Sequence, residues 1–308
     1  MGTFVPCCGA MRAPGGARFA YNPDIPRPPE AHLPMNSPLS DTDQLADARG
    51  WWFVQRGREV LLDETGGVPC GPNPLLGLDP LPALQVGEFD GMPCFAVELP
   101  LDAPFGGFFG DPKRLYDSLP LPARTPLSRA LEVLEWDRTH RFCGSCGAPT
   151  EHRGAGIVRH CSNDACGREH FPRVSPVVIM AVERGEEILL GRSHHFPPGV
   201  YSVLAGFVDA GESAEQAVHR EIFEETALAI RDVRYFASQP WPFPHSLMLG
   251  FQAQWAGGEI VCDPREIEDA AFFHVDRLPK TFRFSSTLSF WLIQDFCKRH
   301  GRPWPDGA

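Results

Sequence analysis

One segment, residues 206–228, constrains this chain more than any other. It reads GFVDAGESAEQAVHREIFEETAL. Ser213, followed three residues later by a glutamine, forms a capping box, and this predicts that a helix begins there. On that helix Glu221, Glu224 and Glu225 stand at positions i, i+3 and i+4, so their carboxylates share one face. The fold must therefore accommodate three negative charges side by side.

Three like charges on one helix face destabilise the helix unless a positive group binds them. Hard divalent cations such as Mg²⁺ and Mn²⁺ prefer oxygen ligands and would meet that need. Arg220 stands next to the glutamates and Glu212 lies at the helix start, so an Arg–Glu pair can brace the preceding loop against the helix. The alternative is a solvated acidic face, because glutamates often occur together on exposed helices.

A second cluster of four cysteines stands before this helix, in two pairs: Cys143, Cys146, Cys161 and Cys166. Thiolates on two tight turns form the tetrahedral ligand set that Zn²⁺ prefers, and a four-cysteine site has no open position for catalysis. The second pair is CxxxxC, wider than the usual CxxC, so His160 and His170 are possible substitute ligands. Buried or free thiols are the alternative. A redox CxxC is disfavoured because the βαβ context is missing.

The charge of the chain excludes some classes of function. The 308 residues carry 28 Lys and Arg against 39 Asp and Glu, a formal net charge of −11. No basic run appears, which argues against an extended binding surface for nucleic acid. A small phosphate ester remains possible if metal ions supply the positive charge. No apolar run is long enough to span a membrane and residues 1–38 do not form a signal peptide, so we expect a cytoplasmic protein.

Composition and the positions of glycine and proline divide the chain into four expected regions. They are a poorly ordered N-terminus at 1–45, a small mixed α/β domain at 46–135, a zinc ribbon at 136–173 and an α/β catalytic domain at 174–308. Thr125 before Pro126 predicts the start of a helix that runs to about Arg138. A last helix is expected from about Ser286 to Gly301. Strand-like runs are 51–55, 59–62, 92–99, 176–183, 187–192, 201–208, 246–255 and 271–275.

The helical segment resembles a known signature. Its spacing fits the pattern G-x5-E-x7-R-E-x-x-E-E, which resembles the Nudix box of Nudix hydrolases, through Gly206, Glu212, Arg220, Glu221, Glu224 and Glu225. The resemblance implies a Nudix α/β/α sandwich. Ala227 stands where the box has a glycine that would cap the helix in a left-handed conformation, and alanine there costs roughly 1 kcal/mol. The carboxylates themselves are unaffected by this departure.

A proline-rich array follows the box, with the sequence SQPWPFPHS at 238–246. Its three prolines hold the run extended, so that Trp241 and Phe243 could form a rigid platform for a base or nicotinamide ring. A turn that packs the aromatic rings into the core is an equally good interpretation. The array resembles the one that marks the NADH pyrophosphatase family, whose members also have a four-cysteine ribbon before the catalytic domain. The match covers about residues 136–280.

This resemblance implies a role for particular residues. Zinc would bind the four cysteines, and the catalytic ions would be held by the Ala205 carbonyl, Glu221, Glu224, Glu225 and Glu266, with Arg220 in the catalytic set. Substrate contacts would come from Phe171, Gln239, Pro240, Trp241, Pro242, Phe243, Pro244, His245, Ser246 and the backbone of Leu288. Gly156 occupies the place of an acidic residue that touches substrate in some members. Homodimers are usual in this family.

The expected activity is hydrolysis of NADH or NAD⁺ to nicotinamide mononucleotide and AMP, with two or three Mg²⁺ or Mn²⁺ ions and one structural zinc. One alternative is removal of the NAD cap from RNA 5′ ends, where only the terminal dinucleotide need enter the site. Others are a pyrophosphatase for ADP-ribose, nucleotide sugars or nucleoside triphosphates, and a non-catalytic Nudix binding module. The intact glutamates argue against that last alternative.

Overall fold

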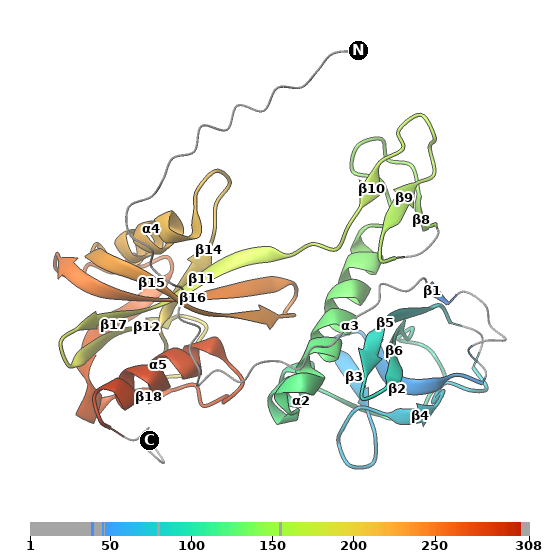
Figure 1. Cartoon of the computed structure of the whole chain (residues 1–308), viewed down its shortest axis with the longest axis horizontal. Coiled ribbons are helices and arrows are strands. Elements are labelled where there is room, and N and C mark those ends of the chain that lie inside the picture. Colours follow the sequence, from blue (N-terminus) through green and yellow to red (C-terminus); the bar gives the residue numbers. More distant parts are fainter. Residues whose placement is uncertain (1–37, 40–44, 46, 79–80, 154–155, 303–308) are drawn as a thin grey trace.

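A computed structural model describes residues 38–39, 45, 47–78, 81–153 and 156–302. Figure 1 shows an N-terminal lobe built around one sheet, a small ribbon at the far end of a long helix, and a C-terminal lobe in which helices lie on both sides of a sheet. Among the described residues, no helix is both long and apolar enough to cross a bilayer. The expectation of poor order at 1–45 falls almost entirely outside the described residues.

The N-terminal sheet has the strand order β1-β5-β6-β2-β3-β7, with β4 paired to β2. Alternation along β2 sends Trp52 and Val54 to one face of the sheet and Phe53 to the other, so each face has its own core. The strands are β1 (Pro38–Leu39), β2 (Arg49–Arg56), β3 (Glu59–Leu62), β4 (Cys70–Pro72), β5 (Ala83–Phe89), β6 (Met92–Glu98) and β7 (Phe108–Gly110).

Two helices complete this lobe, α2 (Pro112–Ser118) and α3 (Leu121–Thr139). The predicted helix start at Thr125 was wrong, because α3 begins five residues earlier, with Pro120 as its N-cap, and contains Pro126 in its interior. Pro126 is buried together with Leu127 and Ala130. Burial of this face against the sheet therefore outweighs the backbone hydrogen bond that proline removes.

The ribbon is a small antiparallel sheet of β8 (Thr150–His152), β9 (Arg159–Cys161) and β10 (Glu169–His170). A buried polar network joins it to the end of α3. Asp137 accepts hydrogen bonds from His152 at 2.6 Å and from Arg159 at 2.5 Å. Arg159 also donates to Thr150. The ribbon is thus fixed to the helix that carries it.

The C-terminal lobe has the strand order β15-β16-β11-β12-β17, and β14 pairs with β11. Helix α4 (Ala214–Thr226) packs on one face and α5 (Leu288–Arg299) on the other, each over a separate core. The strands are β11 (Ser175–Arg184), β12 (Glu187–Ser193), β14 (Leu204–Phe207), β15 (Ala229–Trp241), β16 (Ser246–Gly257) and β17 (Ile267–His274). Short β13 (Val200–Tyr201), β18 (Lys280–Thr281) and the 3₁₀ turn η1 (Val275–Arg277) connect them.

This helix–sheet–helix arrangement confirms the predicted α/β fold class with a ribbon and a mixed N-terminal region. Strand β15 was missing from the predicted strands, and its last residue is Trp241. The proline-rich array is therefore the end of a strand followed by a tight connection to β16, in which Trp241 pairs with Ser246.

Candidate active site

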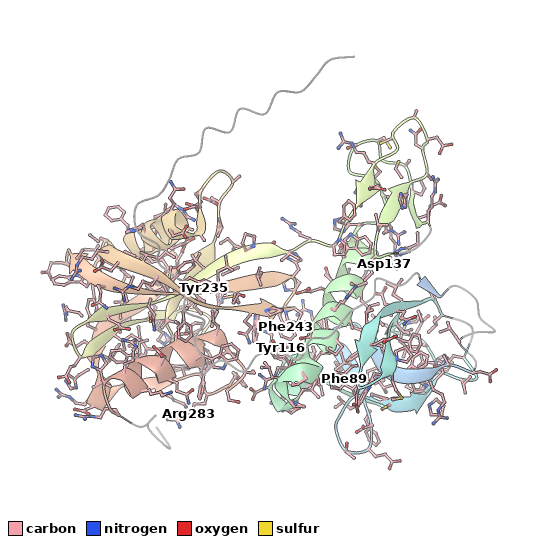
Figure 2. All side chains as sticks on the ribbon, viewed as in Figure 1. Phe89, Tyr116, Asp137, Tyr235, Phe243 and Arg283 are labelled. Carbon is pink, nitrogen blue, oxygen red and sulfur yellow. The ribbon has the colours of Figure 1, made fainter. Side chains whose placement is uncertain are left out.

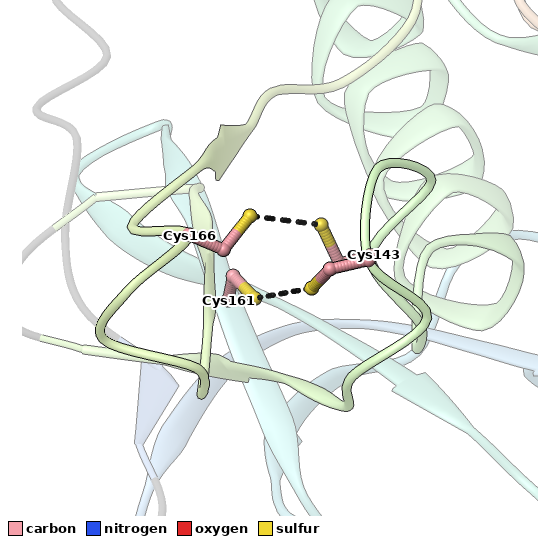
Figure 3. Close-up of side chains that lie close together, drawn as sticks. Cys143, Cys161 and Cys166 are labelled. Atoms are coloured by element: carbon pink, nitrogen blue, oxygen red, sulfur yellow. Dashed lines mark hydrogen bonds between the residues drawn. The ribbon is translucent and has the colours of Figure 1, made fainter.

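The four cysteines converge between the two ribbon turns (Figure 3). One Sγ atom of each lies within 4.8 Å of the others. The Sγ atoms of Cys143 and Cys166 are 3.8 Å apart, and those of Cys146 and Cys161 are 3.4 Å apart. Zn–S bonds of about 2.3 Å in a tetrahedron place sulfurs about 3.8 Å apart. The donor set and its spacing therefore fit a zinc ion.

Tight backbone turns make this convergence possible. Gly147 (φ 75°) and Gly167 (φ 59°) follow the two knuckles in the left-handed conformation that side chains disfavour. Backbone N–H groups of Ser145 and Cys146 donate to Cys143 and lower the pKa of its thiol to about 6, which favours the thiolate that metals bind. His160 and His170 are not part of the metal-ligating cluster of the described residues.

Helix α4 begins as the capping box predicts. The Ser213 hydroxyl accepts from the Gln216 N–H, and the Gln216 side chain accepts from the Ser213 N–H at 2.7 Å. The helix ends at Ala227, whose φ of 59° is left-handed although it carries a Cβ. The 261–267 loop contacts this end of the helix through a hydrogen bond from the Val261 N–H to the Thr226 carbonyl.

The carboxylates of Glu221, Glu225 and Glu266 converge. An oxygen of each lies within 4.8 Å of the others. Glu221 and Glu225 belong to the buried face of α4, whereas Glu266 is exposed on the loop before β17. That loop reaches the helix because Asp263 donates its backbone N–H to the Glu225 carbonyl at 3.0 Å. Glu224 points to the exposed side, where it pairs with Arg220 at 2.9 Å.

The electrostatics of this cluster are unfavourable without a cation. Burial, and then the charges of Glu221, Glu266 and Glu224, raise the pKa of Glu225 to about 8. Burial also raises the pKa of Glu221. The Oε2 atom of Glu225 is buried and has no hydrogen-bond partner. An unpartnered buried carboxylate oxygen beside two further carboxylates is the donor set that hard divalent ions prefer.

Arg220 braces the loop that precedes α4. Its guanidinium donates to both oxygens of Glu212, to Glu221 at 2.9 Å and to the Phe207 carbonyl at 2.9 Å. Hydrogen bonding from Arg220 lowers the pKa of Glu212, so this carboxylate stays ionised. The Glu212 carboxylate in turn accepts from the backbone of Asp209 at 2.8 Å. The predicted Arg–Glu brace is thus present.

Strand β14 closes the cluster from the sheet side. A Cβ on Gly206 would lie 1.9 Å from the Cδ of Glu221, so only glycine leaves room for that carboxylate. Ala205 is the preceding residue, paired with Ile179 of β11, and its carbonyl belongs to the same strand edge. Glycine at 206 therefore allows the glutamate and the strand backbone to approach one point.

The proline-rich array lies mostly between the lobes. Gln239 is 3% exposed, and its amide is used internally, accepting from the Leu288 N–H at 2.8 Å and donating to the Ser286 carbonyl. Trp241 and Phe243 are half-buried against the core of the N-terminal lobe. The remaining members are Pro240, Pro242, Pro244, His245 and Ser246, and His245 contacts Ser175 at 3.2 Å. The rings therefore pack on a core, as one interpretation of the array expects, and stacking on a base or nicotinamide ring stays a prediction.

The other expected substrate residues are dispersed. Phe171 is 62% exposed just after β10, and Leu288 is buried at the start of α5. Phe207, an exposed ring that directly follows Gly206, was not among the predicted site residues. Tyr116 of α2, which contacts the array, was not among them either. An aromatic residue beside the box glycine was a usable signal for Phe207, whereas nothing local marks Tyr116.

Comparison with known proteins agrees with this geometry. The NUDIX domain family matches residues 172–292, and the NADH pyrophosphatase zinc ribbon domain matches residues 138–171. A protein of Stutzerimonas stutzeri named NAD-capped RNA hydrolase NudC is 44% identical over 84% of this chain and 94% of its own length. Its Pseudomonas putida namesake is 41% identical over 83% and 93%.

A Nudix hydrolase structure from Nitrosomonas europaea is 21% identical, covering 53% of this chain and 94% of its own, with a TM-score of 0.43. Each of the two curated relatives is matched over more than two thirds of this chain and of its own length. The chain therefore belongs to the NADH pyrophosphatase family of Nudix hydrolases, and it is a hydrolase that acts on a pyrophosphate bond.

Proposed function

We propose that this enzyme hydrolyses the pyrophosphate of an NAD-type dinucleotide to nicotinamide mononucleotide and AMP, either free or as the 5′ cap of an RNA. The observation that carries the proposal is the convergence of Glu221, Glu225 and Glu266 around an unpartnered buried oxygen. The name shared by the relatives, NAD-capped RNA hydrolase, favours the capped RNA. Only the terminal dinucleotide need enter the site in that case, so the acidic charge of the chain is no obstacle.

We propose that the three glutamates, helped by the Ala205 carbonyl and Glu224, hold Mg²⁺ or Mn²⁺. When bound, such ions neutralise the pyrophosphate and acidify an attacking water. Glu225 is our candidate for the group that accepts the proton of that water, because Glu224 is paired with Arg220. Arg220 keeps Glu212 and Glu221 in place, and the water oxygen attacks phosphorus as the bridging P–O bond breaks.

We propose that the rings of the substrate stack on exposed aromatic residues near the carboxylate cluster, on the ribbon side and in the array. Phe207 adjoins the carboxylate cluster, whereas Phe171 belongs to the ribbon side, and Trp241 and Phe243 lie in the array. A homodimer would let one protomer offer its Phe171 to its partner, and we keep this oligomeric state as a proposal. The remaining array residues, from Gln239 to Ser246, would set the shape of the pocket.

The test is a turnover panel with product separation by chromatography. NADH, NAD⁺, ADP-ribose and NAD-capped RNA are each incubated with the purified protein, with Mn²⁺ or in metal-free buffer. The proposal expects nicotinamide mononucleotide from NADH or NAD⁺, or release of the nicotinamide mononucleotide cap from RNA, and only with the cation. Turnover of ADP-ribose alone would overturn it in favour of a different pyrophosphatase.

A further inference from the structure

Helices α2 and α3 of the N-terminal lobe both contact the C-terminal lobe, and α2 forms hydrogen bonds with two of its segments. The Tyr116 hydroxyl donates to the Pro240 carbonyl at 3.0 Å, and the Asp117 carboxylate accepts from the Ser286 N–H at 3.1 Å. These two neighbouring residues of α2 therefore bind two separate segments of the catalytic lobe. One segment is the start of the array, and the other directly precedes α5.

Aromatic packing reinforces the contact between α2 and the C-terminal lobe. The ring of Tyr116 lies edge-on to Trp241 at 5.8 Å and to Phe243 at 6.1 Å, and the last two rings are 4.9 Å apart. Figure 2 shows Tyr116 and Phe243 next to each other between the lobes. Lys113, one turn earlier on α2, lies over Phe243 with its Nζ 5.5 Å from the ring centre. Trp241 and Phe243 thus both pack on the N-terminal lobe.

The array needs this outside support for a chemical reason. Prolines have no backbone N–H, so Pro240, Pro242 and Pro244 donate nothing to the neighbouring strand. β15 ends at Trp241, which still pairs with Ser246, so the strand ladder does not extend to the 242–245 connection that contains Pro242 and Pro244. Gln239 compensates from the inside by linking the array to the Ser286–Leu288 segment. Tyr116 and Asp117 then hold both ends of that link from the other lobe.

We propose that α2 positions the substrate-binding face of the array, with Tyr116 and Asp117 as positioning residues that do not touch substrate. The inference rests on the proposed function, because it takes the array as a substrate contact. Its consequence is that the N-terminal lobe contributes to the affinity for dinucleotide. Loss of a contact from Tyr116 or Asp117 should then weaken substrate binding, while the carboxylate cluster on α4 keeps its own geometry.

The experiment compares Tyr116→Phe, which removes only the hydroxyl, with Asp117→Ala and its conservative counterpart Asp117→Asn, which retains the accepting oxygen. The matched control is Tyr235→Phe on β15, whose ring packs on Phe251 and has no contact with α2 among the described residues. With NADH and Mn²⁺, Tyr116→Phe and Asp117→Ala should raise KM about five-fold and leave kcat within two-fold. Asp117→Asn and Tyr235→Phe should resemble the wild type.

A second readout does not need turnover. Amide exchange in residues 246–250 should accelerate about five-fold in Tyr116→Phe and Asp117→Ala, and not in Tyr235→Phe. Unchanged amide exchange in both Tyr116→Phe and Asp117→Ala would overturn the inference, whatever the substrate is. Faster exchange with an unchanged KM, or with a fall in kcat alone, would also overturn it. A wild-type protein that hydrolyses no dinucleotide refutes the proposed function and, with it, the positioning of substrate.

Discussion

The ribbon and the carboxylate cluster both gather acidic ligands, yet they are built in opposite ways. In the ribbon, four sulfurs surround a closed point, and glycines occupy the left-handed positions Gly147 and Gly167. At the cluster, three carboxylates meet on one side only, an oxygen of Glu225 has no partner, and the left-handed position at the helix end is Ala227. The ribbon relieves strain at its turns, whereas the catalytic helix retains it.

This difference separates a metal that stabilises a fold from a metal that enables a reaction. The ribbon is a small three-stranded sheet, so we expect its order to depend on a bound zinc ion. Helix α4 packs through Ala217, Val218 and Ile222 on the sheet, so it keeps its place whether or not the carboxylates are neutralised. The open side and the unsatisfied oxygen of the cluster are then available to substrate and cation.

The largest expected effect is loss of the zinc ion. Cys161→Ala should reduce bound zinc from one per chain to none and abolish amide-exchange protection in residues 141–171, because zinc supplies about 10 kcal/mol to small zinc-dependent folds. Omitting Mn²⁺ should leave the protection of α4 unchanged. Cys70→Ala, an exposed cysteine outside the ribbon, is the control and should keep its zinc. If the ribbon stayed protected from amide exchange without zinc, the ribbon and the carboxylate cluster would not differ in their dependence on a metal.

Glu225→Gln tests the catalytic half of the comparison. The amide keeps the size of the side chain but removes the charge and the proton acceptor, so kcat should fall by at least about 10²-fold. The folded state should survive, because the glutamine is nearly isosteric. Steady-state kinetics with NADH, together with a thermal melt, checks both statements. Full activity in this variant would reject the assigned role of Glu225.

The same variant sharpens the comparison through pH. Burial and neighbouring carboxylates raise the pKa of Glu225 to about 8 in the metal-free fold, above the unfolded value near 4.5. The folded state therefore binds more protons than the unfolded state between these values, and stability falls as pH rises from about 4.5 to 8. Metal-free Glu225→Gln should melt at least about 3 °C above the wild type at pH 8.5 and equally at pH 4.5. Equal melting at both pH values would contradict a strained cluster.

Local patterns predicted the parts of the site that local chemistry controls. The capping box at Ser213 and the i, i+3, i+4 glutamate spacing need only one helix. Glu266 came from the family resemblance alone, because its approach depends on a loop docked on the end of α4. The contact between Gln239 and Tyr116 could not be predicted from the sequence, because the two residues are 123 positions apart. Pro126 misled the prediction of α3 because tertiary burial overrode a local helix-start signal.

The smallest effect concerns the left-handed turns on the two sides of the comparison. Ala227→Gly should stabilise the protein by about 1 kcal/mol, because glycine adopts φ 59° without the Cβ penalty and the box pattern has glycine there. Gly147→Ala should destabilise the ribbon by a similar amount for the converse reason. Chemical denaturation of each variant with zinc present measures both changes. If Ala227→Gly gained nothing, the helix end would be relaxed by its contact with the 261–267 loop, and the strain assigned to the catalytic side would lie elsewhere.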